Sequence, residues 1–283
     1  MTGALIVARY ALREAVRRRV ILVVLVLTAG FLALYALGAK LTFDEVNGLA
    51  APDQLDDRVL AGSTLFGLAM FTILFLGAVL AVFLTLGAVR GDAERGLLQP
   101  IVVRPVGRTS LLLGRYAGAA LVCTLYVITI YVGAMVITGI TGDWWPDDPV
   151  GPGAGLVLGV LVIAALSLLG SVFLSATANG IAVFMLFGAG LAAGLLGQIG
   201  DALAVQTLQD VAKVSSWVLP FEALYQGGLH ALTQDAEGVT GVIVQLGPFG
   251  GAQDAGPGLW LWALAYLGLV GAAARAGFAR RDL

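Results

Sequence analysis

The chain has 283 residues, of which 59% are hydrophobic and only 12% are charged, and its net charge is −2. Soluble domains carry about 25% charged residues, so this composition excludes a water-soluble protein and indicates an integral membrane protein. A single cysteine, Cys123, and a single histidine, His230, exclude an internal disulfide and a metal site rich in these residues, and we expect no metal site.

Residues 1–19 predict an amphipathic helix on the inner membrane surface. Arg9, Arg13 and Arg17 recur every four residues, with Glu14 among them, opposite a face of leucine, alanine and valine. Such a basic helix is attracted to anionic lipid, so we expect membrane lipid as one partner of the chain. The pattern leaves open whether the helix also touches a cytosolic protein.

Long uncharged stretches predict the membrane spans. A helix needs about 20 apolar residues to cross the hydrocarbon core, and four stretches of 20, 31, 27 and 20 uncharged residues meet this requirement. A fifth stretch of 52 residues would be roughly 78 Å long as one helix, so we expect it to fold back at the turn-like residues 175–180. The six predicted spans are residues 20–37, 60–89, 116–140, 156–174, 181–199 and 259–274.

The alternative interpretation of residues 20–37 is a cleaved signal peptide. Its apolar run is longer than the hydrophobic region of a signal peptide, and the 19 residues before it carry five arginines. We therefore interpret this segment as the first span.

Charge distribution predicts the orientation. With the N-terminus inside, the inner segments carry 13 Lys/Arg and 4 Asp/Glu, and the outer segments carry 3 Lys/Arg and 14 Asp/Glu. All five tryptophans fall on the outer side or at its interface, where amphipathic rings are favoured. We predict a multi-pass protein of the cell membrane with both termini in the cytosol.

Residues 90–115 form a large inner segment between the second and third predicted spans. It combines five arginines with Asp92 and Glu94 and is interrupted by Pro100 and Pro105. An orientation signal would need only the arginines, whereas charges of both signs suit a contact with another protein. We therefore predict that this segment is functional.

Residues 201–257 form the largest outer segment. They open with an amphipathic stretch that runs into Pro220, and residues 239–246 fit a strand or a short helix equally well. Because few charges lie near Leu219 and Phe221, we expect the segment to dip into the outer leaflet. We interpret His230, a lone histidine, as structural.

Several kinds of chemistry are missing from the sequence. No phosphate-binding loop is present, since the only lysines, Lys40 and Lys213, each follow an alanine, so we expect the chain not to hydrolyse ATP. None of the six predicted spans contains an ionisable Asp, Glu, Lys, Arg or His, which argues against an ion-coupled transporter. Gly-x-x-x-Gly pairs such as Gly155/Gly159 and Gly190/Gly194 allow close helix packing without indicating a particular interface.

Four short motifs resemble the permeases of ATP-binding-cassette (ABC) transporters of the type-2 exporter class. Residues 8–19 are similar to the family's amphipathic helix before the first span. Residues 94–98 (ERGLL) resemble its E-x-G-T-L run, residues 104–108 (RPVGR) with 113–115 (LGR) its RP-x-x-R and LGK elements, and residues 218–224 (VLPFEAL) its LP-x-x-A-L element. The chain departs from these patterns by a leucine in place of the threonine and an arginine in place of the lysine.

The resemblance implies an all-α membrane protein that forms a single permease domain over residues 1–283. It has six transmembrane helices, an N-terminal amphipathic helix, a cytosolic coupling loop and short re-entrant outer helices before the last span. Its partners would be separate nucleotide-binding (ATPase) subunits, and a second copy or a second permease chain. ATP and magnesium would bind to the ATPase subunit, and we expect no cofactor and no catalytic residue on this chain.

The same resemblance, together with the charge pattern, identifies the candidate site residues. The expected contacts with the ATPase subunit are Asp92, Glu94, Arg95, Gly96, Leu97 and Leu98. The expected outer gate comprises Leu219, Pro220, Phe221 and Glu222.

We expect an exporter of an amphiphilic or hydrophobic substrate, because its predicted spans are uncharged. One alternative is a mechanotransmitter of the same fold that acts on an accessory protein at the outer face. Another is an ion-coupled carrier without an ATPase. Nothing in the sequence indicates a nucleic-acid partner.

Overall fold

The structure, a computed structural model, describes residues 19–48, 57–86, 107–233 and 256–280, and all regular secondary structure in these ranges is helical. The helices are α2 (Arg19–Gly48), α3 (Asp57–Thr85), α6 (Arg108–Gly142), α7 (Val150–Phe173), α8 (Ala176–Ala202), α9 (Gln206–Val218), α10 (Pro220–Thr233) and α12 (Pro257–Ala279). Six of them, all except α9 and α10, are long and apolar enough to cross a membrane. The predicted all-α fold with six spans is confirmed.

The helices extend beyond several predicted spans. α2 continues to Gly48, although charged residues begin at Lys40, and α6 begins at Arg108 inside the predicted inner segment 90–115. Charged side chains limit how much of a helix lies in lipid, but adding residues to an existing helix requires no new nucleus. The charge pattern therefore located the spans better than the helix ends.

The turn between the fourth and fifth spans is shorter than expected. The helix breaks at Ser175, whose ψ of 159° is extended, and α8 begins at Ala176. Most of the predicted turn, residues 175–180, is thus the first turn of α8. Asn179, which the sequence suggested as a turn residue, is instead a fully buried helical residue.

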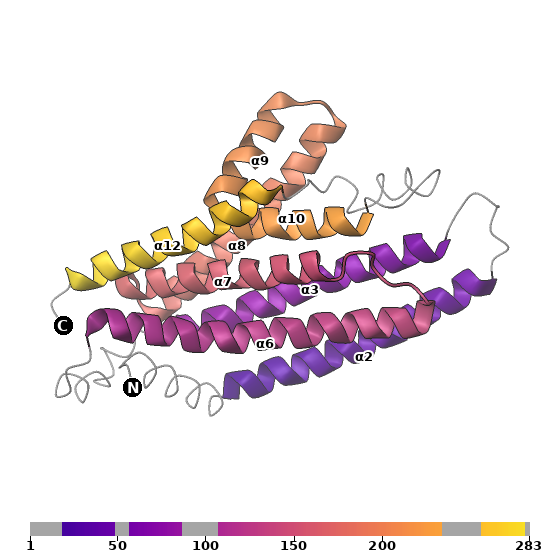
Figure 1. Ribbon diagram of the computed structural model, residues 1–283, viewed down its shortest axis with the longest axis horizontal. Coiled ribbons are helices and arrows are strands. Elements are labelled where there is room, and N and C mark those ends of the chain that lie inside the picture. The colour runs from indigo at the N-terminus through magenta and orange to yellow at the C-terminus, as the bar shows by residue number, and fades with distance from the viewer. Residues whose placement is uncertain (1–18, 49–56, 87–106, 234–255, 281–283) are drawn as a thin grey trace.

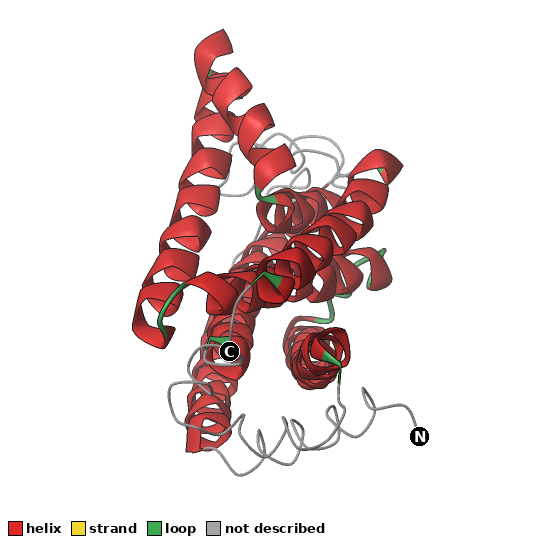
Figure 2. Cartoon of the chain, turned by 90° about the vertical axis from the view of Figure 1, so that its left-hand side faces the viewer, coloured by secondary structure: helices red, strands yellow, loops and turns green. Residues whose placement is uncertain are grey.

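α2, α3, α6, α7 and α12 run roughly along the long axis of the molecule, and α8 crosses them obliquely (Figure 1). α2, α3, α6 and α7 pack on one another, and α12 lies along α7. α9 folds back on α8, so that these two form a hairpin that projects from the bundle (Figure 2). We call the end at which α2 begins and α12 ends the inner end, after the predicted topology, and the opposite end the outer end.

α3 and α7 form the centre of the bundle. In their most apolar stretches 67% of the residues are buried within the protein, against 17–28% in the other four long helices. The four long helices around this centre instead expose large apolar side chains, such as Leu34 of α2, Leu125 of α6, Met185 of α8 and Leu261 of α12. Such a surface is stable only in contact with lipid or with another apolar protein surface.

Hydrogen bonds between hydroxyl groups fix α2 against α6. The Tyr35 hydroxyl and Thr138 Oγ1 lie 2.5 Å apart, and Thr28 Oγ1 and the Tyr126 hydroxyl lie 2.6 Å apart. Hydrogen bonds between membrane helices contribute on average about 0.6 kcal/mol each. These bonds therefore define the register of α2 along α6 but add little to the stability of the pair.

Two of the Gly-x-x-x-Gly pairs receive the short helix α10. On α7, a Cβ atom at Gly155 would lie 3.1 Å from the Leu224 carbonyl oxygen, and one at Gly159 would lie 3.3 Å from that of Phe221. On α8, a Cβ at Gly190 would lie 2.7 Å from Cζ of Phe221. Because Gly159 and Gly190 lie near the middle of their helices, the start of α10 reaches about half-way along the bundle.

Candidate functional site

The four predicted outer-gate residues lie where α9 passes into α10. Leu219 separates the two helices, and Pro220 is the first residue of α10. The N–H at this position makes no hydrogen bond within a helix, so proline can occupy it without loss. Leu219, Pro220, Phe221 and Glu222 are all buried, and Phe221 stacks on Phe187 of α8 with ring centroids 5.7 Å apart. The first turn of α10 is thus held on two sides, by α7 and by α8.

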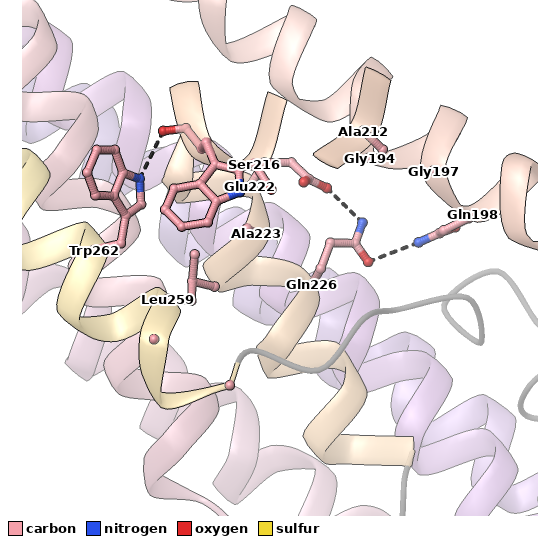
Figure 3. A pocket seen from close by; sticks show the side chains of 13 residues that line it. Gly194, Gly197, Gln198, Ala212, Ser216, Glu222, Ala223, Gln226, Leu259 and Trp262 are labelled. Atoms are coloured by element: carbon pink, nitrogen blue, oxygen red, sulfur yellow. Dashed lines mark hydrogen bonds between the residues drawn. The ribbon is translucent and has the colours of Figure 1, made fainter. Parts of the chain in front are cut away.

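Glu222 is the buried acid of this region, with only 6% of its surface exposed. Its Oε1 accepts a hydrogen bond of 2.8 Å from Nε2 of Gln226, one helical turn further along α10. Oε1 of Gln226 in turn accepts a bond of 3.0 Å from Nε2 of Gln198 on α8 (Figure 3). The three side chains form a polar row that links α10 to α8.

Gly194 of α8 makes room for the carboxylate. A Cβ atom at this position would overlap the Glu222 carboxyl group. Gly188, on the same helix, has open space where its Cβ would be. The absence of a side chain at Gly194 is therefore a condition for the observed position of Glu222.

The electrostatic environment of Glu222 favours its protonated form. Burial raises the pKa of its carboxyl group from 4.5 to about 7, and the hydrogen bond from Gln226 opposes this rise only in part. The side chains of Gln198, Ser216 and Trp262, which line the same region, are uncharged. Repulsion from Glu222 also adds to burial in raising the pKa of Tyr225, which follows on the same helix.

A pocket of about 310 Å³ opens beside this polar row, between α8, α9, α10 and the start of α12. We call it the α10 pocket and define it by Gly194, Gln198, Trp217, Glu222, Gln226 and Trp262 (Figure 3). Trp217 and Trp262 have ring centroids 5.3 Å apart, and Nε1 of Trp262 donates a 2.9 Å hydrogen bond to the carbonyl oxygen of Trp217. The pocket thus combines one carboxyl group, two amides and two indole rings.

The raised pKa of Glu222 predicts a dependence of stability on pH. The folded state holds its proton up to about pH 7, whereas the unfolded chain releases it near pH 4.5. The stabilisation by this group is therefore complete below about pH 4.5 and is lost as the pH rises to about 7.

The measurement is the free energy of unfolding in mixed detergent micelles, for the wild type and for Glu222→Gln, across this pH range. We expect the difference between the two proteins to shift in favour of Glu222→Gln as the pH rises. A difference that does not change with pH would contradict the assignment.

A second buried polar cluster lies near the inner end and centres on Asn179. Its Nδ2 donates hydrogen bonds to the carbonyl oxygens of Ser167 at 2.8 Å and of Leu86 at 3.2 Å. Leu86 directly follows α3, Ser167 belongs to α7 and Asn179 to α8. This Asn179 cluster therefore ties α7 and α8 to the end of α3.

Of the predicted site residues, the structure describes only those of the outer gate. The predicted ATPase contacts, Asp92 and residues 94–98, and the predicted inner-surface residues Arg9, Arg13, Glu14 and Arg17 lie outside the described residues. Within the described part of the chain, no group of three or more His, Cys, Asp or Glu side chains could hold a metal ion.

Sequence reasoning missed Gln198, Gln226, Trp262 and the role of Asn179. The only signal for Gln226 was its spacing of four residues from Glu222.

Comparison with known proteins adds the decisive observation. The sequence model of the family described as ABC-2 family transporter protein matches residues 5–283, which is nearly the whole chain. The chain belongs to the ABC-2 transporter family. No curated protein matches the chain.

Membership in the ABC-2 family confirms the resemblance seen in the four motifs. As a member of this family the chain is a multi-pass membrane permease, a transporter subunit rather than an enzyme. Permeases of the ABC-2 family generally work with an ATPase partner. The polar row and the Asn179 cluster are thus features of a transport subunit.

Proposed function

We propose that this chain is the membrane-spanning subunit of an ATP-driven exporter, powered by a separate nucleotide-binding subunit. The match of the ABC-2 family to residues 5–283 carries this proposal. The sequence supports it, because the chain has no phosphate-binding loop of its own. ATP and magnesium would bind to the partner subunit. The working unit would contain two permease chains, either two copies of this one or this one and a second.

The orientation follows from the charges. We place the inner end in the cytosol of a cell-membrane protein, because the inner segments carry 13 of the 16 Lys/Arg residues. The outer-gate residues Leu219–Glu222 would then enter the membrane from the outer side. The depth that the start of α10 reaches, beside Gly159 and Gly190, supports such a re-entrant course.

The predicted coupling segment, residues 90–115, is proposed to transmit force to α3 and α6. These two helices pack directly on each other, and α3 is one of the two central helices of the bundle. A force applied to the chain between them would therefore act on the core of the protein. The Asn179 cluster would carry the movement further, because Leu86 at the end of α3 is bonded to α8.

The substrate class is proposed to be amphiphilic or hydrophobic. The pockets between the helices are lined mainly by apolar side chains, and the α10 pocket adds a small number of polar groups at one side. Binding sites for small molecules have this character, with a few polar groups that orient an otherwise apolar ligand.

The test is purification of the tagged chain from native membranes in a mild detergent. We expect a protein with a phosphate-binding loop to co-purify, and the complex, but not the isolated chain, to hydrolyse ATP. ATP hydrolysis by the isolated chain would contradict the proposal. Recovery of an active transport unit without any ATPase would instead support an ion-coupled carrier.

A further inference from the structure

The α10 pocket contains one buried acid and no basic side chain among the described residues that line it. Among the described residues that line the pocket, Glu222 receives its hydrogen bond from the uncharged Gln226. A buried carboxylate without a cation is destabilising, because hydrogen bonds from amides only partly replace the water it has lost. Among the described residues the carboxylate thus has no counter-charge, and a positively charged ligand would supply one.

The position of the carboxyl group is fixed from two sides. Gln226 is itself held by Gln198 across the interface between α10 and α8, so the donor that meets Glu222 has a defined orientation. The carboxyl group occupies the space beside Gly194, and any side chain larger than the hydrogen of glycine at this position would overlap it. A ligand would therefore meet a preorganised group, which lowers the entropy lost on binding.

Two indole rings, those of Trp217 and Trp262, also line the pocket. Trp262 is oriented by its hydrogen bond to the backbone of Trp217, and the two rings contact each other at 58°. The face of tryptophan attracts cations more strongly than that of any other side chain, and its area also covers apolar groups. These indole rings thus suit a cation that carries a hydrocarbon portion.

We infer that the α10 pocket binds an organic ammonium group attached to a hydrophobic chain, with Glu222 as its counter-ion and Trp217 and Trp262 as its aromatic contacts. The volume of about 310 Å³ equals that of about ten water molecules and lies at the lower end of the range for ligand pockets. An anion would be repelled by Glu222, and a metal ion would find only one carboxylate among the described lining residues.

Two kinds of molecule in a membrane carry such an ammonium group. One is an aminolipid, which carries it in its head group, and the other is a transported amine. Both present the same cation on the same kind of apolar chain, so the site chemistry is common to them. The inference goes beyond the proposed function, because binding to the purified chain requires neither an ATPase nor transport.

The experiment compares octylammonium with octanol as probes for the full chain in detergent, with binding followed by tryptophan fluorescence. The two molecules share a hydrocarbon chain and differ in charge. We expect octylammonium to bind wild type about tenfold or more tightly than octanol. In Glu222→Gln this preference should disappear while octanol still binds, which would also show that the pocket is intact.

A matched pair of glycine variants tests the geometry. Gly194→Ala pushes the carboxyl group from its position, so we expect it to weaken octylammonium binding. Gly188→Ala adds the same methyl group to the same helix where there is open space, and we expect wild-type binding.

The unmutated protein provides an independent measurement. Octylammonium stays charged throughout, so its affinity should fall between about pH 8.5 and about pH 5.5 as the site becomes protonated. Octylammonium that binds no better than octanol, or that binds equally well to Glu222→Gln, would overturn the inference. So would an affinity that does not change with pH.

Lipid composition distinguishes the two sources. In nanodiscs of phosphatidylglycerol the site would be open to the probe. If adding phosphatidylethanolamine lowers the affinity for octylammonium, an aminolipid is the occupant. If the affinity stays the same, the site is one for a transported amine. Failure of an ATPase to co-purify would contradict the proposed function without affecting any of these results.

Discussion

Replacing Asn179 by leucine is expected to lower the free energy of unfolding by about 2–4 kcal/mol. The Asn179 side chain is fully buried and donates to carbonyl oxygens that lie on two other parts of the chain, at Ser167 and Leu86. Leucine has a similar size but no donor. The Leu86 carbonyl belongs to the residue that directly follows α3, and leucine at position 179 would leave it without the hydrogen bond it receives from Asn179.

The control for Asn179→Leu is Ser167→Ala. The Ser167 hydroxyl is buried and has no hydrogen-bond partner among the described residues, so its removal should leave stability unchanged or slightly raised. Ser167→Ala also keeps the backbone carbonyl that Asn179 uses. The measurement is unfolding of the purified chain by a denaturing detergent. Equal stability of Asn179→Leu and wild type would show that the cluster does not hold the three helices together.

The second large effect is expected from Glu94, in the proposed coupling segment. In the assembled complex, Glu94→Arg should reduce substrate-stimulated ATP hydrolysis and transport by about tenfold or more, because reversing a charge at a protein contact costs several kcal/mol. Glu94→Ala should have a smaller effect of the same kind. The complex itself should still form, because we expect Glu94 to be one contact among several in this segment.

Asp210→Arg is the matched control for Glu94→Arg. It makes the same change in charge at an exposed position of α9, far along the chain from the coupling segment. We expect normal transport from it. If both Glu94 variants transport at the wild-type rate, the arginines around Glu94 serve only to orient the protein, and the proposed coupling contact is wrong.

The amino-acid sequence by itself determined the membrane class, the number of spans and the family. These features depend on local properties: whether 20 consecutive residues are uncharged, on which side the arginines fall, and which short motifs appear in which order. A span must satisfy its own backbone within its own helix, so its existence is readable from its own residues. The helix ends were less well predicted, as α2 and α6 show, because charge does not end a helix.

The site was decided by tertiary structure. The sequence identified Glu222 as one of four gate residues. The residues that position it from another helix, Gln198 by its bond to Gln226 and Gly194 by the space it leaves, lie 24 and 28 residues earlier in the chain. Asn179 looked like a turn residue because asparagine favours turns, and it became a buried donor only because α3 and α7 bring two carbonyl groups to it. Which polar groups are buried together depends on how helices pack, and packing of apolar helices in lipid follows from small residues at specific contacts rather than from hydrophobicity. The glycines that admit α10 were visible in the sequence, but only the fold shows which helix they admit.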